Sequence, residues 1–467
     1  MIIGGIFLIF LLAAGGYTGC RLKWFCFCHP VLTVKRFFSP GREDAARTPA
    51  VVSENETSYS PMKALTVALA GTLGVGNITG VAAAIALGGA GALFWMWISA
   101  LCTMLIKYAE VYLAVKTRER IVKDGKTEYR GGPMRYFQYF RCGGMLASVF
   151  CGVCIAASFV QGNLLQTAAA VSCADAVFGQ PSSLTAGVLT VCAVLLIFGG
   201  RQRIASFTEK MIPLMTALYF GMGMLILFRN AALLPQIGKD ILSSAFSVKA
   251  LGGGGIGGIS IILAMRHGCA KGVFSHEAGC GTSPISHAGA DTDDPCRQGI
   301  LGIAEVFVDT IVLCTVTGLV LLVSGFGYGG GTQGYALAVM DAFSLWFGNA
   351  AKWILGLSIV FYAFATLVCW SFYGTECVRY FCRKANRSVR KWETRYLLFY
   401  SICTFFGAFV SEGVLWGMSD VLTMTMTVIN TAAVLGLLTY VKTPGLDRTE
   451  TKKIRKISDK IPVSGSD

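Results

Sequence analysis

The sequence predicts an all-α integral membrane protein with about 11 transmembrane helices. Three observations support this fold class. Of the 467 residues, 54% are hydrophobic and only 14% are charged, whereas soluble domains carry about 25% charged residues. The apolar residues form long runs, and a helix needs about 20 of them to cross the hydrocarbon core. Basic residues gather in alternate loops between these runs.

The predicted helices comprise one N-terminal helix and ten that follow it. We expect them near 2–19, 64–89, 92–117, 146–174, 184–198, 212–227, 242–265, 299–323, 353–378, 396–410 and 414–441. No stretch of soluble-domain size separates these runs. We therefore expect an extra helix and linker over 1–63, a ten-helix core over 64–441 and a tail over 442–467. The core divides into one half over about 64–228 and another over about 242–441.

The formal net charge of +14 is distributed unevenly between the two sets of loops. One set carries most of the lysine and arginine, and the opposite set carries only Arg229, Lys239, Lys249 and Lys352. This alternation is the positive-inside pattern of a membrane protein. It predicts a multi-pass protein of the cell membrane, with the N-terminus outside and the C-terminus in the cytoplasm. A nucleic-acid-binding surface would not alternate in this way, so we expect no nucleic-acid partner.

Glycine interrupts two of the predicted spans. The first run is GTLGVGN at 71–77, and the second is GGGGIGG at 252–258. They fall in the first and the sixth of the ten core helices, the same position in two halves of five. An odd number of spans places the two halves in opposite orientations, and paired interruptions in such halves indicate a substrate site at the bilayer midplane. The alternative is that these glycines only permit close helix packing.

The physics of an unwound segment supports the substrate-site interpretation. Glycine tolerates unwinding because it lacks a Cβ. Unwinding frees backbone groups, which must line a cavity enclosed by protein because lipid cannot hydrogen-bond them. Freed N–H groups at the start of a half-helix attract a carboxylate, and freed carbonyl groups coordinate a cation.

The sequence resembles the alanine/glycine:cation symporter family over about residues 5–441. The segments that carry this resemblance are GVGNITGVA at 74–82, GGPM at 131–134, GVFSHEAG at 272–279 and FATLVCWSFYG at 364–374. The resemblance implies the leucine-transporter type fold, a five-plus-five inverted repeat, here with one extra N-terminal helix. It also implies sodium-coupled uptake of alanine or glycine by alternating access, with protons as the alternative coupling ion.

The resemblance, together with the first glycine run, suggests one wall of the substrate site. Gly74, Val75 and Gly76 are expected to offer backbone N–H groups to the substrate carboxylate. Thr72 is expected to add a hydroxyl and Asn77 a side-chain amide. Asn77 also suits an N-cap of the second half-helix, and the two roles are compatible.

The other walls are expected from three further helices. Gln166 is expected near the substrate amino group, with Asn163 on nearly the same helix face; the alternative for Gln166 is a bond to a neighbouring helix. The opposing wall is expected from Gly254, Gly255 and Ile256, where relatives usually carry phenylalanine in place of the isoleucine. Trp370 is expected to complete an apolar lining, or else to serve only in packing.

No cofactor is expected other than the coupling cation. In this fold sodium takes carbonyl oxygens at the first break, here those of Ala70 and Leu73, and hydroxyl groups on the eighth helix. Thr366 offers one hydroxyl, but the preceding residue, usually serine or threonine, is Ala365. One oxygen ligand is therefore missing unless water replaces it.

Ionisable residues inside predicted spans are functional candidates. Lys107 and Glu110 lie three apart on the second core helix and are expected to pair. The roles of Glu305 and Asp309 stay open at this stage. Two substitutions relative to the family, Lys271 for arginine and His276 for asparagine, are expected in a cytoplasmic loop, where His276 either makes a polar contact or titrates near neutral pH.

The sequence therefore predicts a secondary transporter of small neutral amino acids whose partners are the substrate, the cation and the lipid bilayer. The alternative is an amino-acid sensor or binding paralogue that does not cycle. An enzyme is not expected, because we find no nucleophile–base set and no metalloprotease motif among the four histidines.

Overall fold

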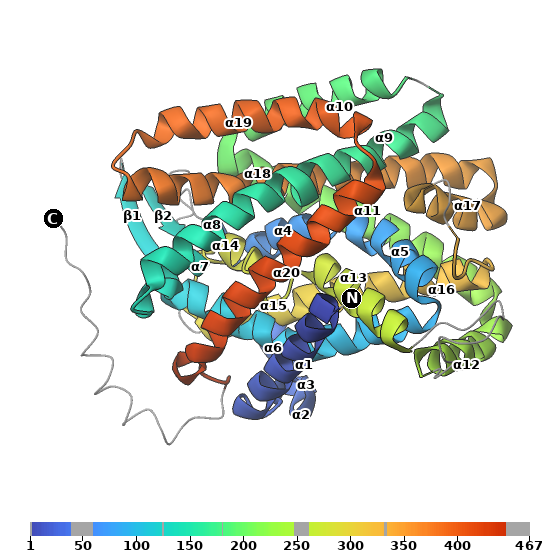
Figure 1. Ribbon diagram of the computed structural model, residues 1–467, viewed down its shortest axis with the longest axis horizontal. Helices are drawn as coiled ribbons and strands as arrows, with labels where there is room; N and C mark the ends of the chain where they lie inside the picture. Colours follow the sequence, from blue (N-terminus) through green and yellow to red (C-terminus); the bar gives the residue numbers. More distant parts are fainter. Residues whose placement is uncertain are drawn as a thin grey trace.

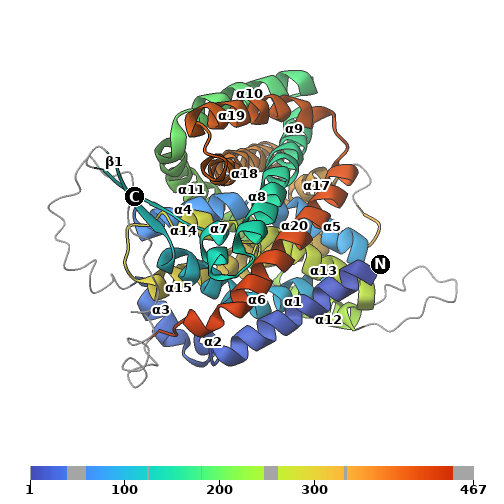
Figure 2. The same ribbon diagram turned by 60° about the vertical axis from the view of Figure 1, so that its left-hand side comes forward.

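The computed structural model describes residues 2–38, 59–123, 126–179, 181–246, 261–330 and 334–444. Figure 1 shows long helices packed into one bundle, with a two-stranded hairpin at one end. Three helices at the start of the chain lie along the outside of this bundle (Figure 2). They are α1 (Ile2–Arg21), α2 (Phe25–Cys28) and α3 (Pro30–Phe38).

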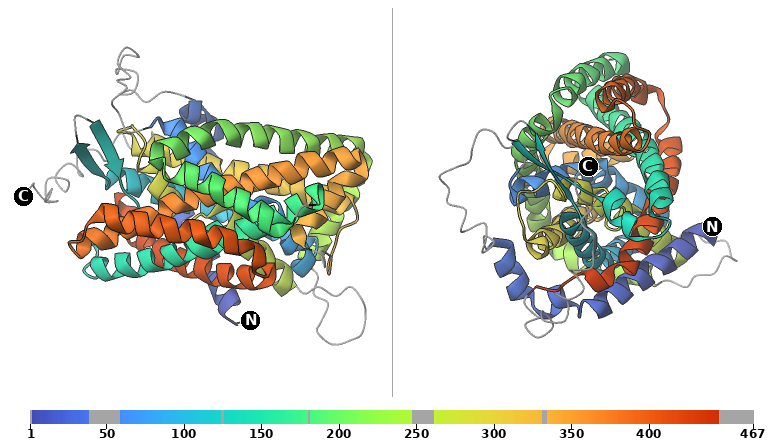
Figure 3. Two further views of the ribbon diagram at one scale, coloured as in Figure 1. Left: turned by 90° about the horizontal axis from the view of Figure 1, so that it is seen from above. Right: turned by 90° about the vertical axis from the view of Figure 1, so that its left-hand side faces the viewer.

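The first half of the core contains two long interrupted helices. Its elements are α4 (Pro61–Thr72), η2 (Val75–Asn77), α5 (Thr79–Gly88), α6 (Gly91–Lys116), β1 (Glu119–Lys123), β2 (Lys126–Arg130), α7 (Pro133–Tyr136), η3 (Phe137–Tyr139), α8 (Gly143–Phe159), η4 (Val160–Leu164), α9 (Leu165–Phe178), α10 (Ser182–Ile197) and α11 (Gly200–Arg229). The strands β1 and β2 pair antiparallel, and the hairpin projects from the bundle in Figure 3.

The second half also contains an interrupted helix, formed by α15, η6 and α16. Its elements are η5 (Ala231–Leu233), α12 (Leu234–Ala245), α13 (Ile261–His276), α14 (Ser283–His287), α15 (Pro295–Val306), η6 (Phe307–Cys314), α16 (Thr315–Val323), α17 (Tyr335–Phe347), α18 (Asn349–Lys384), α19 (Val389–Phe406), η7 (Gly407–Phe409), α20 (Glu412–Gly436) and η8 (Leu438–Tyr440).

The break in the first core helix lies where the glycine run predicts it. Helix α4 begins with Pro61 after Ser60, whose side chain accepts a hydrogen bond from the Lys63 N–H. The helix ends at Thr72, and the chain resumes after the 3₁₀ turn η2 in a direction bent by 60°. Proline suits the first turn of α4 because its missing N–H is not needed there. At the other end of α4, glycine makes the break in the helix possible.

Six described helices are long and apolar enough to cross a membrane, and the bent pair α4/α5 makes a seventh. Shorter apolar helices occur at Gly5–Arg21, Ser182–Ile197 and Tyr335–Phe347. The last of these, α17, is not among the predicted helices. These spans identify an integral membrane protein.

The predicted boundaries of the sixth core helix are wrong. Residues 242–265 were expected to form one span, but α12 ends at Ala245 and α13 runs from Ile261 to His276. Helix α13 continues past Lys271 because that side chain is buried, with Nζ 2.7 Å from Asp420 Oδ1 and over the Trp416 ring. The second glycine run, 252–258, lies outside the described residues.

Positive charge marks one end of the bundle. We call the basic end the part that contains the hairpin β1–β2, the last turn of α6 at Lys116 and the last turn of α18 at Lys384. Helices α12 and α17 lie at the opposite end in Figure 1.

Candidate functional site

The break between α4 and α5 is buried and closely packed. Gly74 lies between α18 and α9, where a Cβ would collide with the Thr366 hydroxyl and lie 2.8 Å from Gln166 Oε1. A Cβ at Gly76 would lie 3.1 Å from the Phe274 ring. Thr366 and Gln166 approach the backbone at position 74 so closely that glycine is the residue that fits there without displacing them.

Gln166 contacts the break directly. Its Oε1 accepts a hydrogen bond from the Val75 N–H at 3.2 Å, and its Nε2 donates to the Gln161 carbonyl at 3.1 Å. The side chain thus satisfies an N–H that was expected to meet a substrate carboxylate. The Thr72 hydroxyl does not point into the break, since it lies 3.4 Å from the carbonyl oxygens of both Ala68 and Leu69 in its own helix.

Asn163 does not share a partner with Gln166. The expectation that both lie on nearly the same face assumed an α-helix, but Asn163 lies in the π-helical turn η4. The wider turn rotates the two side chains apart. Asn163 Nδ2 donates to the Tyr400 carbonyl of α19 at 2.7 Å, and no hydrogen-bond partner of its Oδ1 is found among the described residues.

Helix α18 brings Thr366 and Trp370 against α4. The Thr366 hydroxyl donates to the Ala70 carbonyl at 2.9 Å, and the Trp370 indole N–H lies 3.3 Å from the Gly71 carbonyl. Two of the expected sodium ligands, the Thr366 hydroxyl and the Ala70 carbonyl, are thus hydrogen-bonded to each other. Ala365 is buried beside them and contributes no oxygen side chain.

Asn77 joins the break to the seventh core helix. Its Nδ2 donates to Asp309 Oδ1 at 2.7 Å and to the Asp309 carbonyl at 3.0 Å. The other carboxylate oxygen accepts from the hydroxyl groups of Ser275 at 2.8 Å and Thr310 at 2.7 Å. Asn77 Oδ1 is buried, without a partner in the described chain. The sequence indicated Asp309 only as an ionisable residue in a span. Ser275 lies in the segment at 272–279 that carries the family resemblance, but it was not among the expected site residues.

A small cavity adjoins the break. It is lined by Leu73, Gly74, Asn77, Ile78, Tyr219, Leu313 and Tyr362. Its volume of about 10 Å³ gives room for about one water molecule. Two predicted site residues, Gly74 and Asn77, therefore line a cavity that is too small for an amino acid in this conformation. Gly254, Gly255 and Ile256 lie outside the described residues.

A second buried polar network lies farther toward the basic end. Lys107 Nζ lies 3.9 Å from Glu110 Oε1, so these two residues pair as predicted, and it lies nearer, at 3.2 Å, to Glu305 Oε1. His287 Nε2 lies 3.2 Å from Glu305 Oε2. Glu110 also accepts hydrogen bonds from the backbone N–H of Gly279 and from the Asn430 amide. Glu305 and Asp309 thus belong to separate networks.

His276 is not an exposed loop residue. It is the last residue of α13 and is fully buried, where its Nδ1 accepts a hydrogen bond from the Ala278 N–H at 3.0 Å. The prediction that His276 and Lys271 lie in a loop is therefore wrong. Both residues belong to α13. Each buried polar side chain has a hydrogen-bond partner, so the helix can continue through them.

The entry to α4 is held at the basic end by Tyr59. Its hydroxyl donates to the Ser286 carbonyl at 3.0 Å, and Arg201 Nη2 donates to the same hydroxyl at 2.9 Å. The Arg201 guanidinium also stacks over the Tyr59 ring at 4.6 Å. Burial raises the pKa of Tyr59, although the neighbouring Arg201 lowers it in part. The Tyr59 hydroxyl therefore stays protonated and donates a hydrogen bond to the Ser286 carbonyl.

Comparison with known proteins identifies relatives over nearly the whole chain. The model of the sodium:alanine symporter family matches residues 1–459. The sodium/alanine symporter AgcS of Methanococcus maripaludis is 34% identical over 460 residues, which cover 97% of this chain and 95% of AgcS. The probable sodium/glutamine symporter GlnT of Bacillus subtilis is 31% identical over 453 residues, covering 97% of this chain and 89% of GlnT.

Solved structures confirm the fold predicted from the sequence. MhsT in complex with L-phenylalanine matches with a TM-score of 0.58 at 13% identity, over 81% of this chain and 89% of MhsT. A sodium-coupled sialic acid symporter in a substrate-bound outward-open state matches with a TM-score of 0.57 at 12% identity, over 93% of this chain and 86% of the symporter. These proteins share the leucine-transporter type fold with this chain.

Proposed function

Because the chain belongs to the sodium:alanine symporter family, we propose that it couples sodium entry to the uptake of a small neutral amino acid, alanine or glycine, by alternating access. The family and the solved relatives are transporters, so the chain is a transporter and not an enzyme. The observation that carries the proposal is the broken helix α4/α5, whose Gly74 backbone is contacted by Gln166 and Thr366.

The size of the substrate follows from the packing of the break. The adjoining cavity is small, and Tyr219, Leu313 and Tyr362 close its far side. In the substrate-bound state the carboxylate replaces Gln166 Oε1 as acceptor for the Val75 N–H, and the small side chain faces these apolar and aromatic residues. Backbone N–H groups at a helix start favour an anion in this position. A substrate with a large side chain would fit only if the helices around the break moved farther apart.

The coupling ion uses oxygen atoms on both sides of the break. Thr366 and the carbonyl groups of Ala70 and Leu73 form one candidate sodium site, in which water takes the place of a side chain at Ala365. Of the two acidic residues left open by the sequence, Asp309 contacts the break through Asn77, whereas Glu305 pairs with Lys107. We therefore assign a role in ion coupling to Asp309 and a structural role to Glu305.

The charge of the loops supports the orientation that we propose. The basic end faces the cytoplasm of the cell, the N-terminus lies outside, and residues 442–467 form a cytoplasmic tail. Residues 1–63 form the extra helix and linker, and the transporter core spans 64–441. Separation of Tyr59 from Arg201 and Ser286 would release α4 at the basic end and open the break toward the cytoplasm.

Uptake into liposomes tests the proposal. The purified chain is reconstituted, and accumulation of labelled alanine and glycine is followed with a sodium gradient, a proton gradient or neither. We expect accumulation that depends on sodium. Saturable binding of alanine without accumulation under any gradient would favour the alternative, an amino-acid sensor or binding paralogue. If a proton gradient alone drives accumulation equally well, the coupling ion is the proton and not sodium.

A further inference from the structure

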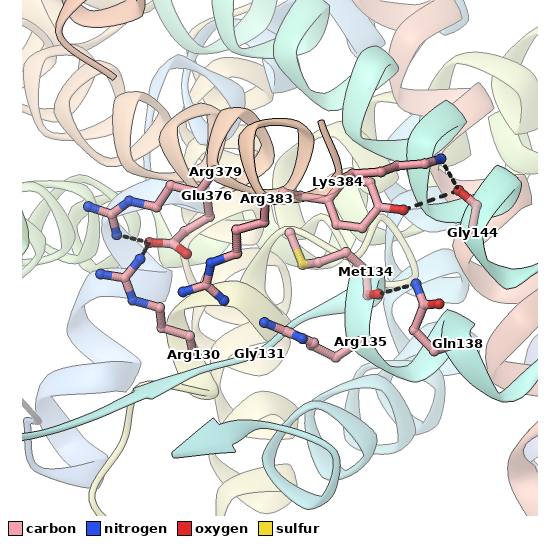
Figure 4. A pocket seen from close by; sticks show the side chains of 11 residues that line it. Arg130, Gly131, Met134, Arg135, Gln138, Gly144, Glu376, Arg379, Arg383 and Lys384 are labelled. Carbon is pink, nitrogen blue, oxygen red and sulfur yellow. Dashed lines mark hydrogen bonds and ion pairs between the residues drawn. The ribbon is translucent and has the colours of Figure 1, made fainter. Parts of the chain in front are cut away.

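A polar cavity of about 410 Å³ opens at the basic end, away from the broken helix. Its walls come from β2, α7, the first turn of α8 and the last turns of α18 (Figure 4). The charged side chains that line it are Arg130, Arg135, Glu376, Arg379, Arg383 and Lys384. Five cationic groups thus face one carboxylate across the cavity.

The carboxylates around this cavity are shared between cations. Glu376 contacts both Arg379, at 2.6 Å, and Arg130, at 3.8 Å. Glu119 contacts both Arg135 and Arg383, the latter at 2.8 Å.

Two further carboxylates, Glu128 and Glu393, contact Arg130 and Arg379 from outside the lining. Lys384 contacts the Gly144 carbonyl at 3.2 Å and the Ser148 hydroxyl at 2.7 Å, and it has no carboxylate partner in the described part of the chain. The cavity therefore keeps an excess of positive charge.

The cationic groups converge on one place. In Figure 4 the side chains of Arg135 and Arg383, which come from two different elements, extend toward each other, whereas the Arg130 guanidinium is turned toward the Glu376 carboxylate. Guanidinium groups that face each other repel. Glu119 bridges Arg135 and Arg383 from outside the lining, and an anion bound in the cavity would reduce the repulsion that remains. Arg130 Nε is also buried without a hydrogen-bond partner among the described residues. Planar guanidinium groups match phosphate oxygens in pairs, which makes arginine the preferred residue for such an anion.

We propose that this cavity binds a phosphate group, supplied by the headgroup of an anionic phospholipid. Basic pockets between transmembrane helices on the cytoplasmic side bind such headgroups. The first turn of α8 supports a lipid as the source. Gly144 and Ser148 face Lys384, whereas Met145 and Val149, on the neighbouring face of the same helix, are 66% and 48% exposed. Acyl chains can lie along that apolar face while the phosphate occupies the cavity.

The cavity lies away from the break, since no residue of α4, η2 or α5 lines it. It joins α8 from the first half of the core to α18 from the second. A bound phosphate would hold these two helices together at their basic ends, and we expect it to raise the thermal stability of the folded transporter.

The test measures ligand binding to the purified full-length chain in a neutral detergent. Each probe is added in increasing concentration, and no transport activity is needed. The probes are short-chain phosphatidylglycerol, short-chain phosphatidylcholine and inorganic phosphate. The test variant is Arg383→Gln/Lys384→Gln, and Lys384→Gln alone is the milder version. The matched control is Arg390→Gln/Lys391→Gln, which removes the same charge from exposed residues of α19 that do not line the cavity.

We expect saturable binding of phosphatidylglycerol, an affinity at least about tenfold lower in the test variant and an unchanged affinity in the control. Binding of inorganic phosphate at the same concentrations, lost in the same variant, would support the site and identify a soluble phosphate as its ligand. The proposal is overturned if neither probe saturates, if phosphatidylcholine binds equally well, or if the control variant loses as much affinity as the test variant.

Discussion

Asn77 and Asp309 lie 232 positions apart in the sequence and meet inside the protein, with Asn77 Nδ2 2.7 Å from Asp309 Oδ1. Their contact connects the broken first helix of one half to the seventh core helix of the other. Ser275 adds a third helix through its hydroxyl. Burying a carboxylate costs free energy unless hydrogen-bond donors surround it. Here the donors come from η2, from α13 and from η6 itself.

Asp309→Asn tests the assigned role in ion coupling. The substitution keeps the shape of the side chain but removes the charge that attracts a cation. We expect the sodium concentration needed for half-maximal alanine binding to rise at least about tenfold. The control is Asp341→Asn, which neutralises a carboxylate that is 65% exposed and lies 3.8 Å from Lys352. An unchanged sodium dependence in Asp309→Asn would restrict Asp309 to a structural role.

Gly74→Ala tests the close packing of the break. The added methyl would collide with the Thr366 hydroxyl and press on Gln166 Oε1. Overpacking of this kind costs about 1–3 kcal/mol, so we expect a lower thermal midpoint and a loss of alanine binding. Gly152→Ala on α8 is the control, because nothing lies within 4 Å of the new Cβ there. Normal alanine affinity in Gly74→Ala would show that the break does not form the substrate site.

Gln166→Ala tests the contribution of the Gln166 side chain to stability and to substrate binding. Without Gln166 Oε1, this buried N–H lacks its acceptor, and an unmet buried donor costs about 1–3 kcal/mol. We expect reduced stability of the free protein. We also expect an alanine affinity about tenfold lower, measured by equilibrium binding, because Gln166 Oε1, once displaced from the Val75 N–H, is expected to contact the substrate amino group. Gln236→Ala on the exposed face of α12 is the control. A higher affinity would mean that Gln166 only competes with the substrate carboxylate for the Val75 N–H.

Lys107→Met tests the structural role of the second network. It leaves Glu305 buried without its lysine partner, and breaking a buried pair in this way costs about 3–5 kcal/mol. We expect a large fall in the thermal midpoint, and partial recovery in Lys107→Met/Glu305→Leu, which removes both charges. Lys352→Gln, from an exposed pair, should change stability by about 0–1 kcal/mol. Full stability of Lys107→Met would contradict a structural role for the pair.

The position of the break could be predicted from the sequence because its cause is local. Glycine at 71, 74 and 76 inside an apolar run permits unwinding at that point whatever surrounds it. The long apolar runs likewise allowed most of the membrane spans to be predicted, because a span depends on local composition. Helix ends were less predictable, since Lys271 would end a span in lipid but is buried against Asp420 and Trp416.

The partners of the site residues could not be predicted, because they depend on how distant helices pack. Nothing in the sequence alone places Asp309 beside Asn77 or Glu305 beside Lys107. The π-helical turn at Val160–Leu164 turned Asn163 toward α19, although its spacing from Gln166 suggested a shared face. A π turn in a helix has no clear sequence pattern.

Ala365→Ser tests the sodium site at Thr366. Thr366 Oγ1 lies 2.9 Å from the Ala70 carbonyl oxygen, and Ala365 precedes it in the same buried stretch of α18. A serine hydroxyl there would supply the missing oxygen ligand in place of water and avoid the entropy of holding that water. We expect the sodium concentration for half-maximal alanine uptake to fall by about tenfold, with Ala351→Ser, buried in the same helix, as the control. If Ala365→Ser leaves the sodium dependence unchanged, sodium does not bind beside Thr366, and the oxygen atoms around Asn77 and Asp309 become the remaining candidate for its site.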